Sequence, residues 1–284
     1  MRIPAGLERL RADTQAWFDE LPARVDQLSA RWGLTVDEPY DGGATSWVAP
    51  VALDDGSGAV LKVQWPHREV VHEAEALRRW GGEGAIRLLD HDPERHALLV
   101  ERCEPGTHLG VSRLPHAEDV IIGLVRRLAV PVGPPFGTLE DEAAHWAEAL
   151  PRTWEAAGRP FEADLVGRTL GLLQELGPSQ GEQVLLHQDL HGDNVLAAER
   201  EPWLAIDPKP LAGEIEFAPA PIVRSKELGH SRADVRRRLD RCCDELDLDR
   251  ERARGWAFAQ TVAWAVDGSD AMPEHVQTAR WLIG

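Results

Sequence analysis

Residues 185–194 read LLHQDLHGDN, and the spacing of their polar side chains separates two kinds of enzyme. Four of these residues alternate, so on an extended strand they would all point the same way and predict a mixed nitrogen and oxygen metal site: His187, Asp189, His191 and Asp193. A metallohydrolase using His187, Asp189 and His191 is the function that this arrangement indicates. Gly192 and the turn-prone sequence HGDN argue against an extended strand through the stretch.

A second spacing runs through the same residues. Asn194 lies five positions after Asp189, and Asp207 ends the β-prone run WLAID that follows. Protein kinases transfer phosphoryl groups with such a set, in which one Asp receives the hydroxyl proton while an Asn and a second Asp hold Mg²⁺. Amide and carboxylate oxygens suit this hard cation. Asn194 is the only asparagine in the chain, and its position here favours the kinase interpretation.

That interpretation requires a lysine on a strand and a glutamate on the next helix. The chain has three lysines, and one of them, Lys62, lies within the β-prone run AVLKVQW. Eleven residues later Glu73 enters a predicted helix, with Glu75 as the less favoured alternative. Lysine is disfavoured inside a strand, and Lys62 taken alone would be read as a surface lysine of an edge strand. In the order and company of the other motifs, its ammonium is expected to contact the phosphates of a nucleotide while Glu73 fixes its position.

A glycine-containing stretch, DGGATSW, precedes this strand. Gly42 and Gly43 would allow the backbone to approach phosphates closely, and Ser46 would add a hydroxyl contact. The spacing differs from G-x-G-x-x-G, and an ordinary β-turn is the alternative interpretation.

Composition excludes several other functions. The net charge of −17 argues against a nucleic-acid partner and is compatible with steering of a cationic small molecule, although solubility alone would also explain it. No apolar run approaches the length of a membrane span, and the charged N-terminus lacks a signal-peptide core. Three cysteines cannot form a disulfide framework, so a protein of the reducing cytoplasm is expected, and we expect it to be a monomer.

The order of the predicted elements indicates an α+β protein with two domains. Amphipathic helices over residues 6–32 precede a small antiparallel sheet with one packed helix, and mainly helical patterns follow, at residues 117–129, 139–157, 161–176 and beyond about 226. The change near Cys103 predicts an N-terminal nucleotide-binding lobe at residues 1–102 and a C-terminal catalytic and substrate-binding lobe at residues 103–284. The connector at Glu101, Arg102 and Cys103 would act as a hinge whose backbone binds adenine. The alternative is an ordinary linker.

A resemblance to a known family depends on six stretches in combination: GGATSWVAPV, AVLKV, HEAEALRRW, LLVER, LLHQDLHGDNVL and LAIDPKP. The chain resembles the aminoglycoside phosphotransferase family, in particular its streptomycin 6-kinase and hydroxyurea phosphotransferase group. The resemblance spans residues 10–284. It implies a two-lobed protein-kinase-like fold, ATP, Mg²⁺ and transfer of the γ-phosphoryl group to a hydroxyl of a small molecule. By position it makes Asp189 the base, Asn194 and Asp207 the metal ligands, and Lys62 with Glu73 the phosphate-anchoring pair.

The chain departs from protein kinases in ways that fit a small-molecule enzyme. This chain has HQD where protein kinases have His-Arg-Asp, and IDPK where they have Asp-Phe-Gly. No Ala-Pro-Glu motif follows. His187 and His191 are then expected to hold the loop by hydrogen bonds. An aminoglycoside such as streptomycin is the favoured acceptor, and a metabolic sugar or amino sugar is the alternative. Candidate acceptor-binding residues, each of which could also be an ordinary solvated or core side chain, are Glu214, Glu216, Glu227, Trp264 and Asp267.

Overall fold

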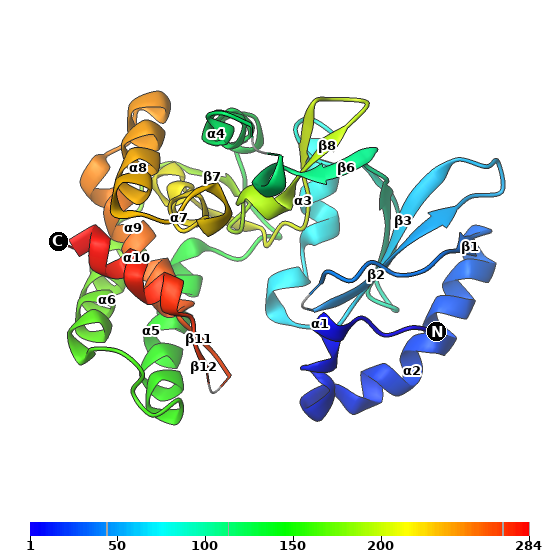
Figure 1. The fold of residues 1–284 in the computed structure, drawn as a ribbon, viewed down its shortest axis with the longest axis horizontal. Coiled ribbons are helices and arrows are strands. Elements are labelled where there is room, and N and C mark those ends of the chain that lie inside the picture. Colours follow the sequence, from blue (N-terminus) through cyan, green and yellow to red (C-terminus); the bar gives the residue numbers. More distant parts are fainter. Residues whose placement is uncertain (44, 113, 269, 284) are drawn as a thin grey trace. The chain divides into compact units, whose positions relative to one another are not determined.

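The computed structural model describes residues 1–43, 45–112, 114–268 and 270–283, with the backbone alone for residues 12 and 13 (Figure 1). Contacts divide the chain into two compact units, Met1–Gly106 and Thr107–Gly284. The first unit is built around an antiparallel sheet, and the second consists mainly of helices.

The sheet of the first unit has the strand order β1-β2-β3-β5-β4. Every neighbouring pair is antiparallel. Its central hairpin joins β2 to β3 through the sequence LDDGS, where Gly56 has a φ of 82° that favours glycine. The strands are β1 (Thr35–Val36), β2 (Ser46–Ala52), β3 (Gly58–Gln64), β4 (Leu88–Asp92) and β5 (Ala97–Glu101).

Two helices, α2 (Arg11–Trp32) and α3 (Glu73–Trp80), cover this sheet, whereas the sequence predicted one. Side chains alternate along β3. Leu61 and Val63 belong to the apolar core that α2 shares with the sheet, while Lys62 between them turns toward α3. The N-terminal amphipathic pattern therefore forms part of the sheet's core, preceded by a short helix α1 (Ala5–Glu8).

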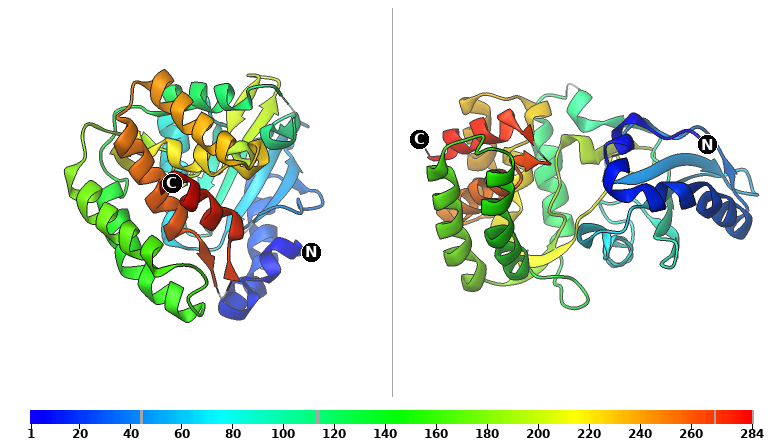
Figure 2. Two further views of the ribbon diagram at one scale, coloured as in Figure 1. Left: turned by 60° about the vertical axis from the view of Figure 1, so that its left-hand side comes forward. Right: turned by 90° about the horizontal axis from the view of Figure 1, so that it is seen from below.

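The second unit is built around α9 (Arg250–Ala263), whose buried aromatic residues Trp256 and Phe258 lie in one large core. Helices α5 and α6 pack against each other and lie side by side in both views of Figure 2, and both contact α9. The other helices are α4 (Ala117–Leu128), α5 (Leu139–Ala156), α6 (Ala163–Leu176), α7 (Pro219–Val223), α8 (Arg232–Leu246) and α10 (Pro273–Ile283).

Short strands and 3₁₀ turns of the second unit hold the polar motifs. The strands are β7 (Gln183–Leu186), β8 (Val195–Ala198), β9 (Trp203–Ala205) and β10 (Leu211–Glu214), with an unpredicted hairpin of β11 (Val266–Asp267) and β12 (Asp270–Ala271). Strand β6 (Pro105–His108) contains the division between the two units. The 3₁₀ turns are η1 (Arg68–Val70) in the first unit, and η2 (Leu109–Val111), η3 (Gly177–Ser179), η4 (Gly192–Asn194), η5 (Ile215–Phe217) and η6 (Lys226–Leu228) in the second.

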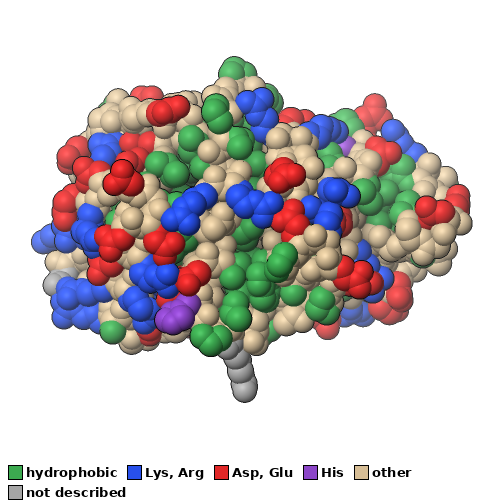
Figure 3. All heavy atoms as spheres, turned by 90° about the horizontal axis from the view of Figure 1, so that it is seen from above, with side chains coloured by type: hydrophobic (Ala, Val, Ile, Leu, Met, Phe, Trp, Pro, Cys, Tyr) green, Lys and Arg blue, Asp and Glu red, His purple; other side chains and the backbone are tan. Residues whose placement is uncertain are grey.

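The surface carries no strong separation of charge on the face drawn in Figure 3. Acidic and basic side chains are interspersed there, although the chain as a whole has a net charge of −17. Among the helices that the structure describes, none combines the length and the apolar character needed to cross a membrane.

Candidate active site

Lys62 and Glu73 form a buried ion pair in the first unit. The Lys62 ammonium lies 2.8 Å and 2.6 Å from the two carboxylate oxygens of Glu73, and the two residues are 7% and 1% exposed. Glu73 is the first residue of α3, where the helix dipole favours a carboxylate. Gln64, two positions along β3, donates to Glu73 Oε2 at 2.6 Å. Strand alternation from Lys62 would have identified this third member.

The predicted phosphate loop and hinge are placed around the same sheet. Gly43 has a φ of 107°, and a Cβ there would lie 2.9 Å from the Ser46 carbonyl oxygen, so the position requires glycine. Around Gly42 a Cβ would meet no atom of the described residues within 4 Å. Ser46 begins β2 and is buried to about the same degree as Lys62 on the neighbouring strand β3.

The predicted hinge follows β5. Glu101 is the last residue of that strand, and its carboxylate accepts a hydrogen bond from the backbone N–H of Arg87 at 2.9 Å. Arg102 forms an exposed ion pair with Glu104 at 3.2 Å, and Cys103 is half-buried. These residues lie just before the division between the two units, after Gly106.

The stretch from His187 to Asn194, here called the catalytic loop, is not a strand. Strand β7 ends at Leu186, and η4 occupies Gly192–Asn194. The alternating arrangement that would align His187, Asp189, His191 and Asp193 is therefore wrong. Gln188 adopts a φ of 64°, which is rare outside glycine and turns the chain directly before Asp189.

Asn194 and Asp207 lie at the same end of the β8-β9 hairpin. In its antiparallel register Val195 pairs with Ala205, and the Ile206 N–H donates to the Asn194 carbonyl oxygen at 3.0 Å. The residue after Ile206 is Asp207, which has a left-handed φ of 57°. Such backbone strain in a non-glycine residue often marks a functional site.

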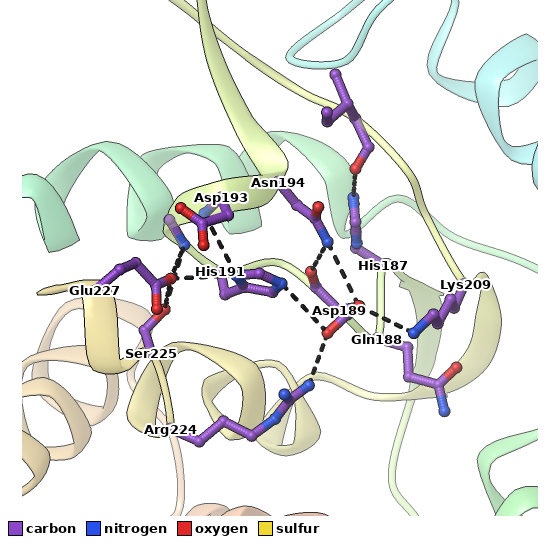
Figure 4. A network of polar contacts seen from close by, with 12 residues as sticks. His187, Gln188, Asp189, His191, Asp193, Asn194, Lys209, Arg224, Ser225 and Glu227 are labelled. Carbon is purple, nitrogen blue, oxygen red and sulfur yellow. Dashed lines mark hydrogen bonds and ion pairs between the residues drawn. The ribbon is translucent and has the colours of Figure 1, made fainter. Parts of the chain in front are cut away.

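Asp189 shares its carboxylate with two cations (Figure 4). Lys209 Nζ lies 3.0 Å from Oδ2, and Arg224 Nη2 lies 2.7 Å from Oδ1. Burial alone would raise the pKa of Asp189, but the charges of Lys209, Arg224 and His191 outweigh it and hold that pKa far below its usual range. The carboxylate is therefore ionised and ready to accept a hydrogen bond from a hydroxyl group.

Neither Lys209 nor Arg224 was predicted as a partner of Asp189. Lys209 is one of only three lysines and follows Asp207 by two residues, so the scarcity that identified Lys62 could have identified it. Arg224 gave no such signal because arginine is common in this chain. It is held over the ring of Trp264, 4.5 Å from the centroid, where Lys209 also lies at 4.6 Å.

The two histidines of the catalytic loop make supporting hydrogen bonds, as predicted. His187 Nε2 lies 2.9 Å from the Ile206 carbonyl oxygen, and burial lowers the pKa of this histidine to about 4, so Nε2–H donates from a neutral ring. Burial would also lower the pKa of His191, but its hydrogen bond to Glu227 and the charge of Asp189 raise it overall. His191 Nδ1 lies 3.1 Å from Glu227 Oε1.

One group of three described side chains has potential metal-ligand atoms within 4.8 Å of one another: His191, Asp193 and Glu227. Two of its members already bond within the protein, because Glu227 Oε1 accepts from the Gly192 N–H at 2.7 Å and lies 3.1 Å from His191 Nδ1. This group differs from the one that the alternating spacing predicted, since neither His187 nor Asp189 belongs to it.

The candidate acceptor-binding residues are spread over different environments. Glu214 is 2% exposed and binds Arg252 Nη2 at 2.7 Å and the Trp256 indole N–H, so it stabilises the helical core instead of facing an acceptor. Trp264 faces the two cations that hold Asp189 and lies edge-on to Trp146. Glu216 is half-buried in η5, and Asp267 is exposed in β11.

The donor set of the second unit fits a magnesium ion. Asn194 Nδ2 donates to the backbone oxygen of Asp189 at 2.8 Å, which leaves the amide oxygen on the other side of the group (Figure 4). An amide oxygen and the carboxylate of Asp207, at one end of one hairpin, are hard ligands of the kind that Mg²⁺ prefers.

Comparison with known proteins identifies the family. The sequence model of the aminoglycoside/hydroxyurea antibiotic resistance kinases matches residues 31–270. Streptomycin 6-kinase of Streptomyces glaucescens is 41% identical over 282 residues, which cover 95% of this chain and 92% of that protein. Hydroxyurea phosphotransferase of Kitasatospora aureofaciens is 40% identical over 302 residues, which cover 100% of this chain and 86% of that protein.

Solved structures confirm the protein-kinase-like fold. Choline kinase LicA from Streptococcus pneumoniae superposes with a TM-score of 0.64 at 12% identity, covering 91% of this chain and 95% of that one. Aminoglycoside phosphotransferase APH(4)-Ia gives 0.60 at 17% identity, covering 92% and 95%. With the family match and the two relatives, these findings show that the chain belongs to the aminoglycoside/hydroxyurea antibiotic resistance kinases, which are small-molecule phosphotransferases.

Proposed function

We propose that the protein transfers the γ-phosphoryl group of ATP to a hydroxyl group of an aminoglycoside, with streptomycin as the favoured acceptor, and thereby confers resistance. The observation that carries the proposal is the set of Asp189, Asn194 and Asp207 around one short hairpin and its preceding loop. The relative named streptomycin 6-kinase and the net charge of −17, which would attract a cationic acceptor, support the choice of substrate.

In this proposal Asp189 orients the acceptor hydroxyl and receives its proton as the oxygen bonds to phosphorus. The bond between the γ-phosphorus and the bridging oxygen breaks, and ADP leaves. The Lys62 ammonium, fixed by Glu73 at 2.6 Å, would bind the nucleotide phosphates and offset their charge. Asn194 and Asp207 would hold Mg²⁺, which when bound supplies further positive charge to the phosphates.

A second acceptor is supported by a specific observation. Hydroxyurea phosphotransferase of Kitasatospora aureofaciens matches 100% of this chain at 40% identity, close to the 41% of the streptomycin enzyme. Hydroxyurea is small and neutral, whereas streptomycin is large and cationic. The two acceptors therefore make different demands on the charge of the binding surface.

The test is a phosphorylation assay with ATP and Mg²⁺ against streptomycin, other aminoglycosides, hydroxyurea and amino sugars, with the product identified by its mass and by phosphorus NMR. We expect streptomycin to gain one phosphoryl group, and Asp189→Asn to form this product about 10²–10⁴-fold more slowly. ATP binding without turnover on any acceptor would contradict the proposal. Tightly bound Zn²⁺ in elemental analysis, with activity lost on zinc chelation alone, would favour the metallohydrolase instead.

A further inference from the structure

Three 3₁₀ turns of the second unit, η2, η4 and η6, pack against one another beside the catalytic loop. Gly110 of η2 and Gly192 of η4 both face Glu227 of η6. A Cβ on Gly110 would lie 2.6 Å from Glu227 Cγ, and a Cβ on Gly192 would lie 2.9 Å from the same atom. Both contacts are shorter than real side chains tolerate, so two glycines leave the space that the Glu227 side chain occupies.

The Glu227 carboxylate is directed at the catalytic loop (Figure 4). Its Oε1 accepts from the Gly192 N–H at 2.7 Å and from the Ser225 hydroxyl at 2.7 Å, and it lies 3.1 Å from His191 Nδ1. Two donors and the His191 ring therefore converge on one oxygen of a side chain that is 16% exposed. Hydrogen bonds to an ionised group are stronger than neutral ones, so this carboxylate is a firm anchor for the turn.

The segment that carries Glu227 also reaches Asp189. Arg224, three residues earlier, donates to Asp189 Oδ1 at 2.7 Å, and His191 Nε2 lies 3.8 Å from the same oxygen. The catalytic loop is thus held by residues 224–227 at two places, its carboxylate and its Gly192 amide.

This segment has its own support from α8. The fully buried guanidinium of Arg238 donates to the carbonyl oxygens of Val223 at 2.8 Å, Gly229 at 2.9 Å and Leu228 at 3.3 Å. These three bonds bracket residues 224–227 on both sides. A buried arginine that bonds backbone carbonyls fixes the path of the chain, and here it fixes the path of the segment that holds the loop.

We propose that Glu227 is a positioning residue that sets the geometry of the catalytic loop through Gly192 and His191, and that it does not bind the acceptor. The inference rests on the proposed function in taking Asp189 as the base. It assigns to Glu227 a role different from the acceptor contact that its place in the sequence suggested, because its Oε1 already accepts from Gly192 and Ser225 and contacts the His191 ring.

The experiment compares Glu227→Ala and Glu227→Gln with a matched control, Glu118→Gln. Glu118 is another buried carboxylate of this unit, paired with Arg237 at 3.2 Å and far along the chain from the loop. We expect Glu227→Ala to lower kcat about 10²-fold, the effect of a misplacement of about 1 Å, with KM for ATP and streptomycin changed by less than about threefold. Glu227→Gln keeps an oxygen for Gly192 and Ser225, so its kcat should fall by less than about tenfold.

Hydrogen exchange supplies a readout that does not require an acceptor. In Glu227→Ala the amides of residues 189–194 should exchange faster than in the wild type, whereas Glu118→Gln should leave them unchanged even if its Tm falls equally. If Glu227→Ala does not fold, the comparison uses Glu227→Gln and Ser225→Ala, which removes the hydroxyl donor to Glu227.

Two results would overturn the inference. One is a folded Glu227→Ala with wild-type kcat and wild-type exchange of the loop. The other is a raised KM for the acceptor with kcat unchanged, which would make Glu227 an acceptor contact after all. A wild-type protein that phosphorylates nothing would instead count against the proposed function, and the exchange experiment would still decide whether Glu227 holds the loop.

Discussion

The two ionic centres of the molecule are built differently. In the first unit one lysine faces one glutamate, Lys62 and Glu73, and both are almost fully buried. In the second unit one carboxylate, Asp189, faces Lys209, Arg224 and more distantly His191. The first centre comes from two adjacent elements, a strand and the helix that follows it. The second is assembled from three separate segments of the chain, because Asp189 and His191 share one loop.

This difference indicates what each centre can do. A single buried pair leaves the ammonium in one place, which suits a fixed contact to phosphates. A carboxylate with two cationic partners can give up one partner to an incoming group and remain ionised, which suits a residue that must accept a hydrogen bond from a substrate. The pKa of Asp189 is strongly lowered because these cations stabilise its ionised form.

The largest expected effect tests the shared carboxylate. Asp189→Asn preserves the shape of the side chain but removes its charge and its capacity to take a proton. We expect kcat to fall by about 10²–10⁴, the usual contribution of a general base. Steady-state kinetics with ATP and the acceptor identified by the screen would measure it.

Nucleotide binding provides the control for that variant. Asp189→Asn should bind ATP with an affinity near that of the wild type, because the substitution removes an interaction with the acceptor hydroxyl and not one with the nucleotide. Turnover within about threefold of the wild type would remove Asp189 from the role of base, since a general base contributes far more than that.

The buried pair is tested by Lys62→Met. Loss of one phosphate-binding cation should lower kcat/KM by about 10²–10³. It also leaves the Glu73 carboxylate buried without its ammonium partner, which costs about 3–5 kcal/mol in the free energy of unfolding. Chemical denaturation and ATP kinetics measure the two effects separately.

The double variant Lys62→Met/Glu73→Gln divides these effects. Removal of the uncompensated charge should restore most of the lost stability, while activity stays low because the ammonium is still absent. Recovery of activity in the double variant would mean that Lys62 serves only to neutralise Glu73.

The same contrast explains what sequence could predict. Lys62 and Glu73 are separated by eleven residues and lie on a strand and a helix whose patterns are clear, so their pairing could be inferred. The proximity of Asn194 and Asp207 could be inferred too, because they lie directly before and shortly after the two strands of one hairpin. The helical and antiparallel-sheet regions were likewise predicted, and the kinase-like fold is confirmed by its structural neighbours.

The contact of Arg224 with Asp189 and the contacts of Glu227 could not be inferred in this way. Arg224 lies 35 residues beyond Asp189, and its approach depends on how α7 and η6 are held by a buried arginine of α8. Such contacts depend on packing between elements that are distant in the chain. This packing leaves no periodic pattern in the sequence of the kind that predicts helices and strands. Glu214 shows the same limit, since an acidic residue near the motifs proved to be a core ion-pair partner of Arg252.

A smaller effect distinguishes the two cations on Asp189. Arg224→Lys keeps the charge but loses the planar donor group that reaches Oδ1 at 2.7 Å and lies over Trp264. We expect kcat to fall about tenfold, near the lower end of the cost of a hydrogen bond to a charged group. The matched control is Arg252→Lys, which weakens the buried pair with Glu214 and should lower Tm without changing kcat. Equal kcat values for the two variants would contradict a specific role of Arg224.

The smallest effect concerns pH and the His191–Glu227 contact. Burial raises the pKa of Glu227, but its hydrogen bond and ion pair with His191 lower it to about 2, from an ordinary value of 4.5. The pKa of His191 is raised above its ordinary 6.5. Glu227 therefore stabilises the fold above about pH 4.5 and loses that contribution as pH falls toward 2. His191 stabilises the fold below about pH 6.5 and loses that contribution as pH rises through its raised pKa in the folded state.

Both contributions are complete together only between about pH 4.5 and 6.5. The difference in Tm between the wild type and Glu227→Gln should therefore be largest in that window. Each 1 kcal/mol in the free energy of unfolding corresponds to about 2–4 °C in Tm. His187 acts in the opposite sense, because burial lowers its pKa to about 4 and its neutral form is favoured in the folded state. Since His187 is present in both proteins, the difference in Tm between them removes its effect. Thermal unfolding from pH 4 to 9 measures this difference, and a difference that stays constant as pH rises above 6.5 would show that His191 carries no charge in the contact.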